Sequence, residues 1–222
     1  MIRLLALLSA LVVLLTPIQA SNLLTNGSFN DPPTNGDPSL PPGSTYLTAW
    51  TVFNAEIAQI HPGNGFGITS VDDGYSLDLT GYHDSPPPGG VTQNIATVTG
   101  ATYSISFYVG AIAGLSMVNI SAGNLNDDGG SVSGDGSEVW TQYTNTFQAV
   151  STTTNIQLLG ITASDLGRYL GLDAVDVEFV SGPPTATPEP VSALLFGCGA
   201  LVLAWKRRRP SSGKKNVSLP PQ

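Results

Sequence analysis

The chain has 222 residues, only 11% of them charged, and a formal net charge of −8, which indicates one ordinary domain with appendages. The charge is unevenly placed. All of the 16 acidic residues except Glu189 lie within residues 21–183, where Arg168 is the one basic residue. This segment excludes nucleic acid and anionic lipid as partners, because affinity for phosphate depends on Lys and Arg. Cys198 lies outside the segment, so no disulfide stabilises it.

The first predicted element is a signal helix over residues 1–20. Arg3 gives the segment a charged start, an apolar run follows from Leu4 to Leu15, and the segment ends on the small residue Ala20. This order is typical of a secretory signal peptide, and the apolar run is too short to span a membrane comfortably. We therefore expect signal peptidase to cleave after Ala20 and the following domain to be exported.

Residues 21–183 are expected to form one all-β domain. Thr, Val, Ile, Ser and Gly are plentiful in it, and Gly, Pro, Asn and Asp separate its short apolar runs. Tyr103–Val109 and Ala174–Val180 alternate in the period of half-buried strands, and the spacing of such runs predicts an antiparallel β-sandwich. The predicted strands are Ser28–Phe29, Trp50–Phe53, Ile57–Ile60, Tyr75–Leu79, Val91–Ala96, Thr102–Val109, Met117–Ala122, Val139–Ala149, Thr154–Leu159 and Ala174–Val180.

The strand patterns also resemble a known fold. Asn22–Phe29 resembles the opening of galactose-binding-like jelly rolls, and Trp50–Val52 and Asp73–Leu79 resemble the strands that follow it. The order is especially similar to a group of anchored bacterial proteins related to a plant cell-wall family of unknown function. The resemblance implies a jelly roll over residues 21–181 that binds or organises extracellular polysaccharide.

Jelly rolls of this kind often hold a structural calcium ion between their first and last strands. By that resemblance, the ligands in this chain would be Asn30, Asp31 and Asp173. Their side-chain oxygens are of the type that Ca²⁺ takes as ligands. The alternative is that the two aspartates only cap turns.

A second candidate calcium site lies in a segment rich in Gly, Asp and Ser. Asn124, Asn126 and Asp128 have the spacing of positions 1, 3 and 5 of an EF-hand loop, and Asp135 falls at position 12. Position 1 is Asn, however, and no helical pattern flanks the segment. We favour the alternative that this is a flexible hairpin loop.

Sugar binding requires exposed aromatic rings with polar groups beside them. Tyr82 and His83 lie in an expected loop and are the predicted ligand-binding residues, whereas Trp50 and Trp140 lie in strand patterns and are expected in the core. No motif of a hydrolase, metalloprotease or nucleotide-binding enzyme occurs, so the domain is predicted to be non-catalytic. A divergent carbohydrate-active enzyme stays an alternative, because any acidic chain offers pairs of carboxylates.

The C-terminal part has three predicted segments. A Pro- and Thr-rich linker over residues 184–190 precedes an apolar stretch over residues 191–205, which makes about 22 Å of helix at about 1.5 Å per residue. A basic cluster and tail follow over residues 206–222. The proposed sorting motif and topology cluster are Pro188, Glu189, Pro190, Lys206, Arg207, Arg208 and Arg209.

This order of Pro-Glu-Pro, apolar helix and basic cluster resembles the PEP-CTERM sorting signal of Gram-negative bacteria. The resemblance implies recognition by an exosortase in the inner membrane and, in the same organism, an exopolysaccharide. The basic cluster is expected to stay cytoplasmic, which leaves the domain outside. The tail after residue 209 is longer than is usual in that family.

The sequence thus predicts an exported, exosortase-sorted protein, anchored in the membrane by one transmembrane helix or processed to the extracellular surface. Its β-sandwich would bind exopolysaccharide in a biofilm matrix without catalysis, and calcium is its one candidate cofactor. Two alternatives stay open: a structural or adhesion protein with protein partners, and a divergent carbohydrate-active enzyme.

Overall fold

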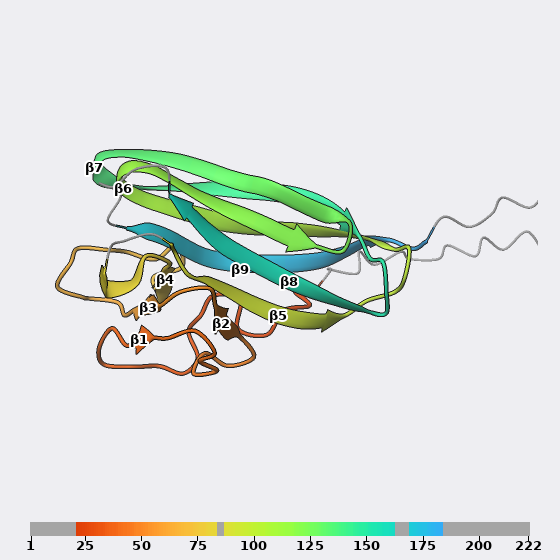
Figure 1. The fold of residues 1–222 in the computed structure, drawn as a ribbon, viewed down its shortest axis with the longest axis horizontal. Helices are drawn as coiled ribbons and strands as arrows, with labels where there is room; N and C mark the ends of the chain where they lie inside the picture. Colours follow the sequence, from red (N-terminus) through yellow and green to blue (C-terminus); the bar gives the residue numbers. More distant parts are fainter. Residues whose placement is uncertain (1–20, 84–86, 163–168, 184–222) are drawn as a thin grey trace, which may run out of the picture. The chain divides into compact units, whose positions relative to one another are not determined.

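The computed structural model in Figure 1 describes residues 21–83, 87–162 and 169–183. These residues belong to the first of two compact units, residues 1–183 and 184–222. The predicted signal helix, transmembrane helix, Pro-Glu-Pro motif and basic cluster all lie outside the described residues. Within the described part of the chain, no helix is long and apolar enough to cross a membrane.

The described residues form an all-β fold in which every strand pair is antiparallel, as predicted. One 3-10 turn, η1, interrupts the strands. The elements in chain order are β1 (Ser39–Leu40), β2 (Thr51–Phe53), β3 (Ile57–Ile60), β4 (Ser76–Asp78), η1 (Gly81–His83), β5 (Gly90–Ala96), β6 (Thr102–Ala122), β7 (Leu125–Gln148), β8 (Thr153–Thr162) and β9 (Leu170–Ser181).

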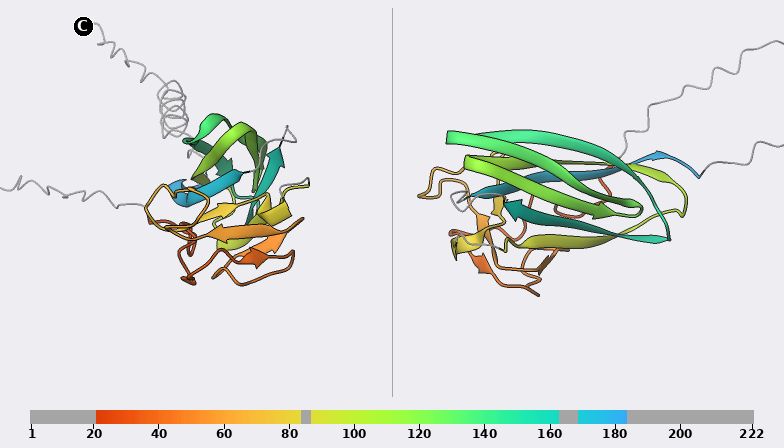
Figure 2. Two further views of the ribbon diagram at one scale, coloured as in Figure 1. Left: turned by 90° about the vertical axis from the view of Figure 1, so that its left-hand side faces the viewer. Right: turned by 45° about the horizontal axis from the view of Figure 1, so that its top comes forward.

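The long hairpin of β6 and β7 joins the two layers of the sandwich. Residues 102–111 of β6 pair with β9, whereas residues 116–121 pair with β8. A register shift between Ala111 and Ala113 marks the bend between these two halves. The order β1-β3-β4-β9-β6 therefore makes the first layer, and β6-β8-β5-β2 makes the second layer. The views in Figure 2 show the segment up to β4 gathered on one side of the long strands.

The core lies between the two layers and follows the alternation that the sequence predicted. Ile105 and Phe107 enter it from the first layer, and Ile120 and Leu158 enter it from the second. Trp50 is also in the core, where it is only 1% exposed, as expected. The outer faces of both layers are left for other contacts.

The predicted strand Ser28–Phe29 is wrong. The segment forms a turn in which Asn26 and Phe29 have φ values of 57° and 56°, and the Phe29 N–H donates to the Asn26 carbonyl. Isolated backbone hydrogen bonds still join this segment to β9. In one of them the Val175 N–H donates to the Gly27 carbonyl at 2.9 Å. The sequence pattern could not show this turn, because the contacts that hold it join residues far apart in the sequence.

Residues 125–138 form the first part of β7, where a flexible loop was favoured. Their backbone pairs with β6 from Ala122 back to Ala113. Gly129 and Gly130 suit this position because an added Cβ would lie 2.7 Å from Ile120 and 2.5 Å from the Tyr143 ring. The glycines that suggested a loop are therefore needed for close packing within a strand.

Candidate functional site

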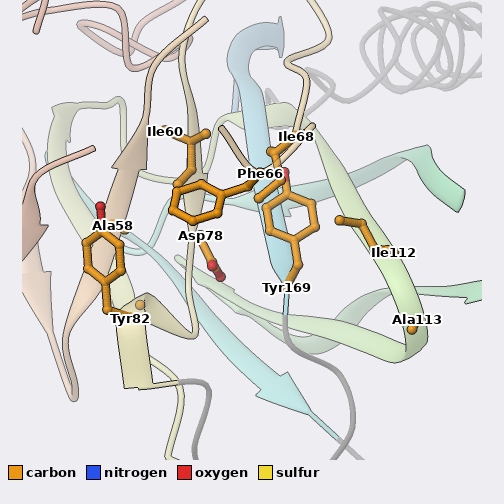
Figure 3. A pocket seen from close by; sticks show the side chains of 10 residues that line it. Ala58, Ile60, Phe66, Ile68, Asp78, Tyr82, Ile112, Ala113 and Tyr169 are labelled. Atoms are coloured by element: carbon orange, nitrogen blue, oxygen red, sulfur yellow. The ribbon is translucent and has the colours of Figure 1, made fainter. Parts of the chain in front are cut away.

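A hollow of about 480 Å³ opens on the outer face of the first layer, beside η1 and the bend of β6. Figure 3 shows aromatic rings around it and one carboxylate, that of Asp78, between the rings of Tyr82 and Tyr169. The residues that line the hollow are Ala58, Ile60, Phe66, Ile68, Asp78, Gly81, Tyr82, Ile112, Ala113 and Tyr169.

A row of five paired residues, three of them Ala or Gly, runs across the sheet at this hollow. Ala58, Asp78, Gly171, Gly110 and Trp140 are direct partners on five successive strands, so their side chains lie on one face. A Cβ added at Gly110 would lie 2.9 Å from the Trp140 ring, and one added at Gly171 would lie 2.6 Å from it. The indole therefore lies across the two glycines on the outer face. Trp140 is partly exposed there, which corrects its expected place in the core.

Two exposed aromatic rings form the rim of the hollow. Phe66 is 59% exposed and Tyr82 is 49% exposed, and their ring centroids lie 6.4 Å apart in an edge-to-face arrangement. The Tyr82 N–H donates to Glu56 at 3.1 Å, and its hydroxyl donates to the Asp37 carbonyl. Burial, followed by the charges of Asp37 and Glu56, raises the pKa of Tyr82 above 10.0, so the hydroxyl stays protonated at neutral pH.

The carboxylate of Asp78 is the polar group at the bottom of the hollow. It is 6% exposed, and its Oδ1 accepts the Thr80 N–H at 2.9 Å, the Thr80 hydroxyl at 2.7 Å and the Leu170 N–H at 3.3 Å. These bonds fix its orientation before any ligand arrives. Such preorganisation reduces the entropy that binding must overcome.

Two aromatic side chains, Tyr169 and Trp140, pack together beside the hollow. Tyr169 is 2% exposed, and its ring meets the Trp140 indole edge-to-face at 6.1 Å. Neither the Tyr169 hydroxyl nor the Trp140 indole N–H makes a hydrogen bond of normal geometry among the described residues. Burial raises the pKa of Tyr169 well above its usual value, although the nearby Ser76 hydroxyl opposes this rise. Both polar groups are buried beside the hollow, and we assign neither as a contact for a ligand.

One known protein family matches most of this chain. Residues 22–167 match the family described as a protein of unknown function, DUF642. The chain belongs to the DUF642 family. This confirms the resemblance to a plant cell-wall family of unknown function that the sequence indicated. No curated protein matches this DUF642 chain.

Several solved structures are weakly similar to this DUF642 chain. The chain is 11% identical to a Clostridium thermocellum xylanase 10B fragment with CBM22-1 and GH10 modules, bound to xylohexaose, with a TM-score of 0.40 over 63% of this chain and 28% of that one. A structure described as CBM4 is 16% identical, with a TM-score of 0.38 over 70% of this chain and 99% of that one. An arabinose-bound MgGH51 α-L-arabinofuranosidase is 17% identical, with a TM-score of 0.45 over 72% and 26%.

The DUF642 chain also spans 64% of a sugar-binding EclA C-terminal domain, at 11% identity and a TM-score of 0.34. These identities and TM-scores are too low to indicate a shared ligand or activity. What the hollow can bind must therefore follow from its own residues.

Of the two predicted ligand-binding residues, Tyr82 lies on the rim of the hollow. His83 ends η1, and its side chain lies outside the described part of the structure. Phe66, Asp78 and Tyr169 were not predicted from the sequence of this DUF642 chain. One local signal could have found Phe66, because an aromatic residue between Gly65 and Gly67 in a loop has little neighbouring side chain to cover it.

The three residues of the first predicted calcium site differ in their burial. Asn30 and Asp31 are exposed, whereas Asp173 is fully buried and accepts N–H bonds from Val71 at 2.7 Å and Ala174 at 2.6 Å. No three His, Cys, Asp or Glu side chains in residues 21–83, 87–162 and 169–183 gather closely enough to hold a metal. Calcium binding at these residues therefore stays a prediction.

The second predicted calcium set lies along the hairpin of β6 and β7. Asn119 donates to the side chains of both Asn126 and Asp128, at 3.4 and 3.0 Å, and Asn124 accepts the Gln148 N–H. Asp135 follows Asp128 in the same extended strand, about 23 Å further along at about 3.3 Å per residue. The structure thus does not bring Asp135 to the other three residues, and this site also stays a prediction.

Glu138 holds the loop that carries Phe66 and Ile68. Its two carboxylate oxygens accept the Thr69 N–H at 3.0 and 3.1 Å, and one of them accepts the Thr69 hydroxyl at 2.5 Å. We expect Glu138→Ala to speed amide hydrogen exchange in residues 62–75 at least several-fold, because the loop loses its attachment to β7. Hydrogen exchange with mass spectrometry measures this directly.

The conservative variant Glu138→Gln keeps one acceptor oxygen and should give a smaller increase in exchange. Residues of β5 and β8 serve as an internal control, since they lie in the other layer. Equal acceleration in those strands would mean that Glu138 supports the whole domain, and the assigned role of holding the loop would then be wrong.

Proposed function

We propose that the hollow between Phe66, Tyr82 and Asp78 binds a neutral carbohydrate, and that the chain is an exported surface protein that binds extracellular polysaccharide without catalysis. The observation that carries the proposal is the pair of exposed rings above a fixed, buried carboxylate. Aromatic rings suit the C–H faces of a sugar, and the carboxylate and hydroxyl groups suit its hydroxyls.

The charges around the hollow favour an uncharged ligand. Asp78 lines it, the Glu56 carboxylate accepts the Tyr82 N–H at its rim, and the charge of Asp37 also acts on Tyr82. The described residues include no Lys or Arg. A uronic acid would meet only negative charge here, and like charges across an interface disfavour binding. Neutral sugars carry no such cost.

The lining of the hollow also supports a binding role over hydrolysis. Glycoside hydrolysis generally uses two carboxylic acids, one on each side of the bond that is cut. Among the described lining residues, Asp78 is the one acid, and it is already bonded to Thr80 and Leu170.

The sequence at both ends supports the proposed location. The signal-peptide pattern of residues 1–20 indicates export. The Pro-Glu-Pro motif, the apolar stretch 191–205 and the basic cluster match the order of an exosortase sorting signal. An anchor there would keep the domain and its hollow on the outer side of the inner membrane, where exopolysaccharide passes.

Isothermal titration of the full chain in detergent, against cello-, xylo-, galacto- and mannan-type oligosaccharides and against oligogalacturonate, tests the binding proposal. At least one neutral series should bind, and oligogalacturonate should not. Tyr82→Ala and Phe66→Ala should each raise Kd about tenfold, or about 1.4 kcal/mol, because each removes a ring from the rim. Tyr46→Ala is the matched control, since Tyr46 is 41% exposed and does not line the hollow.

Three results would overturn the proposal. If Tyr82→Ala and Phe66→Ala behave like Tyr46→Ala, the hollow is not the site. Calcium-dependent self-association with no glycan binding would instead favour an adhesion protein. Release of products from a polysaccharide, lost in Asp78→Asn, would show an enzyme.

A further inference from the structure

The outer face of the second layer carries a row of uncharged polar side chains across five strands. Thr51 of β2 pairs with Thr92 of β5, which pairs with Gln157 of β8. Gln157 also pairs with Ser121 of β6, which pairs with Asn126 of β7. Direct partners lie on the same face of a sheet, so the five side chains form one line of about 19 Å, at about 4.8 Å per strand.

Charge is absent from this face over four of its strands. Strands β2, β5, β6 and β8 contain no Asp, Glu, Lys or Arg, although the domain as a whole is strongly acidic. A face that served only solubility would be expected to share the acidic residues found elsewhere on the surface. Its groups are amides and hydroxyls, which both donate and accept hydrogen bonds.

The central groups of the row are available to a ligand. Gln157 and Ser121 line a hollow of about 320 Å³ on this face, and neither side chain bonds to another described residue. Beside them, the Asn155 amide donates to Thr92 and to Asn94, both at 2.8 Å, which fixes its orientation. The face therefore combines a preorganised amide, that of Asn155, with the unbonded side chains of Gln157 and Ser121.

An apolar strip runs next to this row. Phe53 is the partner of Gly90, which pairs with Leu159 two residues beyond Gln157. A Cβ added at Gly90 would lie 2.8 Å from the Phe53 ring, so the ring lies against the glycine on the outer face. A sugar placed here would rest a C–H face on Phe53 and Leu159 and direct its hydroxyls to Gln157 and Ser121.

We propose that this face is a second binding surface, for an extended neutral polysaccharide that crosses the strands along the row. The hollow at Tyr82 lies on the other layer, with the core between them, so one domain holds two chains at once. Only the ligand class rests on the proposed function. Two sites on opposite faces make the domain a cross-linker of a polysaccharide matrix, and cross-linking gains strength from multivalency.

Affinity electrophoresis of the full chain tests this surface, with mixed-linkage β-glucan, galactomannan and dextran as probes. For the polysaccharide that retards the wild type, Gln157→Ala should weaken binding about five- to tenfold, and Asn155→Ala should weaken it too. Gln142→Ala is the matched control, because Gln142 is an exposed glutamine of β7 in the first layer. Gln157→Thr, which keeps a good strand former, separates loss of contact from loss of folding.

Light scattering of the same mixtures tests cross-linking. The wild type should form large polysaccharide assemblies, and both Tyr82→Ala and Gln157→Ala should lose them. Suppose that Tyr82→Ala abolishes binding and that Gln157→Ala binds as tightly as Gln142→Ala. The proposal of a second binding surface is then wrong, and the proposed function of the hollow is supported. If Gln157→Ala weakens binding and Tyr82→Ala does not, the second surface stands and the proposed function of the hollow fails. If no probe binds, both are overturned.

Discussion

Raising the pH from about 4 to 8 is expected to lower the free energy of unfolding because of one buried carboxyl group. Asp173 is fully buried in β9. Burial raises the pKa of Asp173 from 3.8 to about 7, the charge of Asp72 adds to this rise, and the N–H groups of Val71 and Ala174 oppose it. The protonated form is therefore favoured in the folded state.

The direction of the effect follows from proton binding. Between pH 4 and 7 the folded chain holds a proton on Asp173 that the unfolded chain has released, so stability falls as pH rises through this window. At 1.36 kcal/mol for each unit of pKa, the full shift corresponds to on the order of 4 kcal/mol. Below pH 4 both states are protonated, and the effect ends.

Chemical unfolding of the full chain at pH 4.5, 6 and 8 in EDTA measures the effect. Asp173→Asn should have a flatter profile than the wild type, because an amide does not titrate in this range. Asp127→Asn, at an exposed position of β7, is the matched control and should keep the wild-type slope. Identical slopes for Asp173→Asn and the wild type would contradict the prediction.

The same experiment tests the predicted calcium site. A calcium ion would hold the Asp173 carboxylate ionised and would remove its preference for a proton. Calcium that raises stability at pH 8 and flattens the profile, with both effects lost in Asp173→Asn, would establish the site. No response to calcium would leave Asp173 as a structural acid bonded to the loop at Val71.

Trp50→Ala is expected to lower the free energy of unfolding by about 3–5 kcal/mol, the cost of truncating a fully buried tryptophan. The ring is 1% exposed and lies 5.4 Å from the Phe29 ring. Its indole N–H donates to the Asn26 carbonyl at 2.9 Å. The substitution therefore opens a cavity and also removes a hydrogen bond that holds the turn at Asn26, whose other contact with the sheet includes the bond from the Val175 N–H to the Gly27 carbonyl.

Two variants separate these contributions in denaturant unfolding. Trp50→Phe keeps most of the buried apolar surface and loses the bond to Asn26, so its loss should be clearly smaller. Trp140→Ala removes the same residue type from a partly exposed position and should also cost less. A larger loss for Trp140→Ala than for Trp50→Ala would mean that the outer indole, and not the inner one, supports the fold.

The contrast between these two tryptophans shows what the sequence could predict. Alternation within one strand identifies which side chains face a core, and it placed Trp50 correctly. It does not show what lies on the neighbouring strands. Trp140 covers the outer face because Gly110 and Gly171 pair beside it and leave room for its ring. That arrangement depends on register between distant strands, which no local pattern contains.

The residues of the candidate site were predictable only where a local pattern identifies them. Tyr82 follows from a local signal, a tyrosine beside a glycine between strands. Asp78 and Tyr169 come from segments about ninety residues apart, and Asp78 pairs with Gly171 only in the folded sheet. Asp173 was predicted as a calcium ligand, and that prediction stays untested. Its burial depends on the distant Val71 loop, whose N–H bonds to it, and no local pattern contains that contact.

The path of β9 has a mechanical consequence. The strand begins at Leu170, next to Tyr169 in the hollow, and ends at Ser181, just before the linker to the C-terminal segment. Its 12 residues extend about 36 Å, at about 3.3 Å per residue, between β4 and β6 on either side. Tension between a glycan held in the hollow and the chain beyond residue 183 would run along the strand axis. If the hollow binds a glycan as proposed, such a load would act on the hydrogen bonds of the ladder in shear and would engage many of them together.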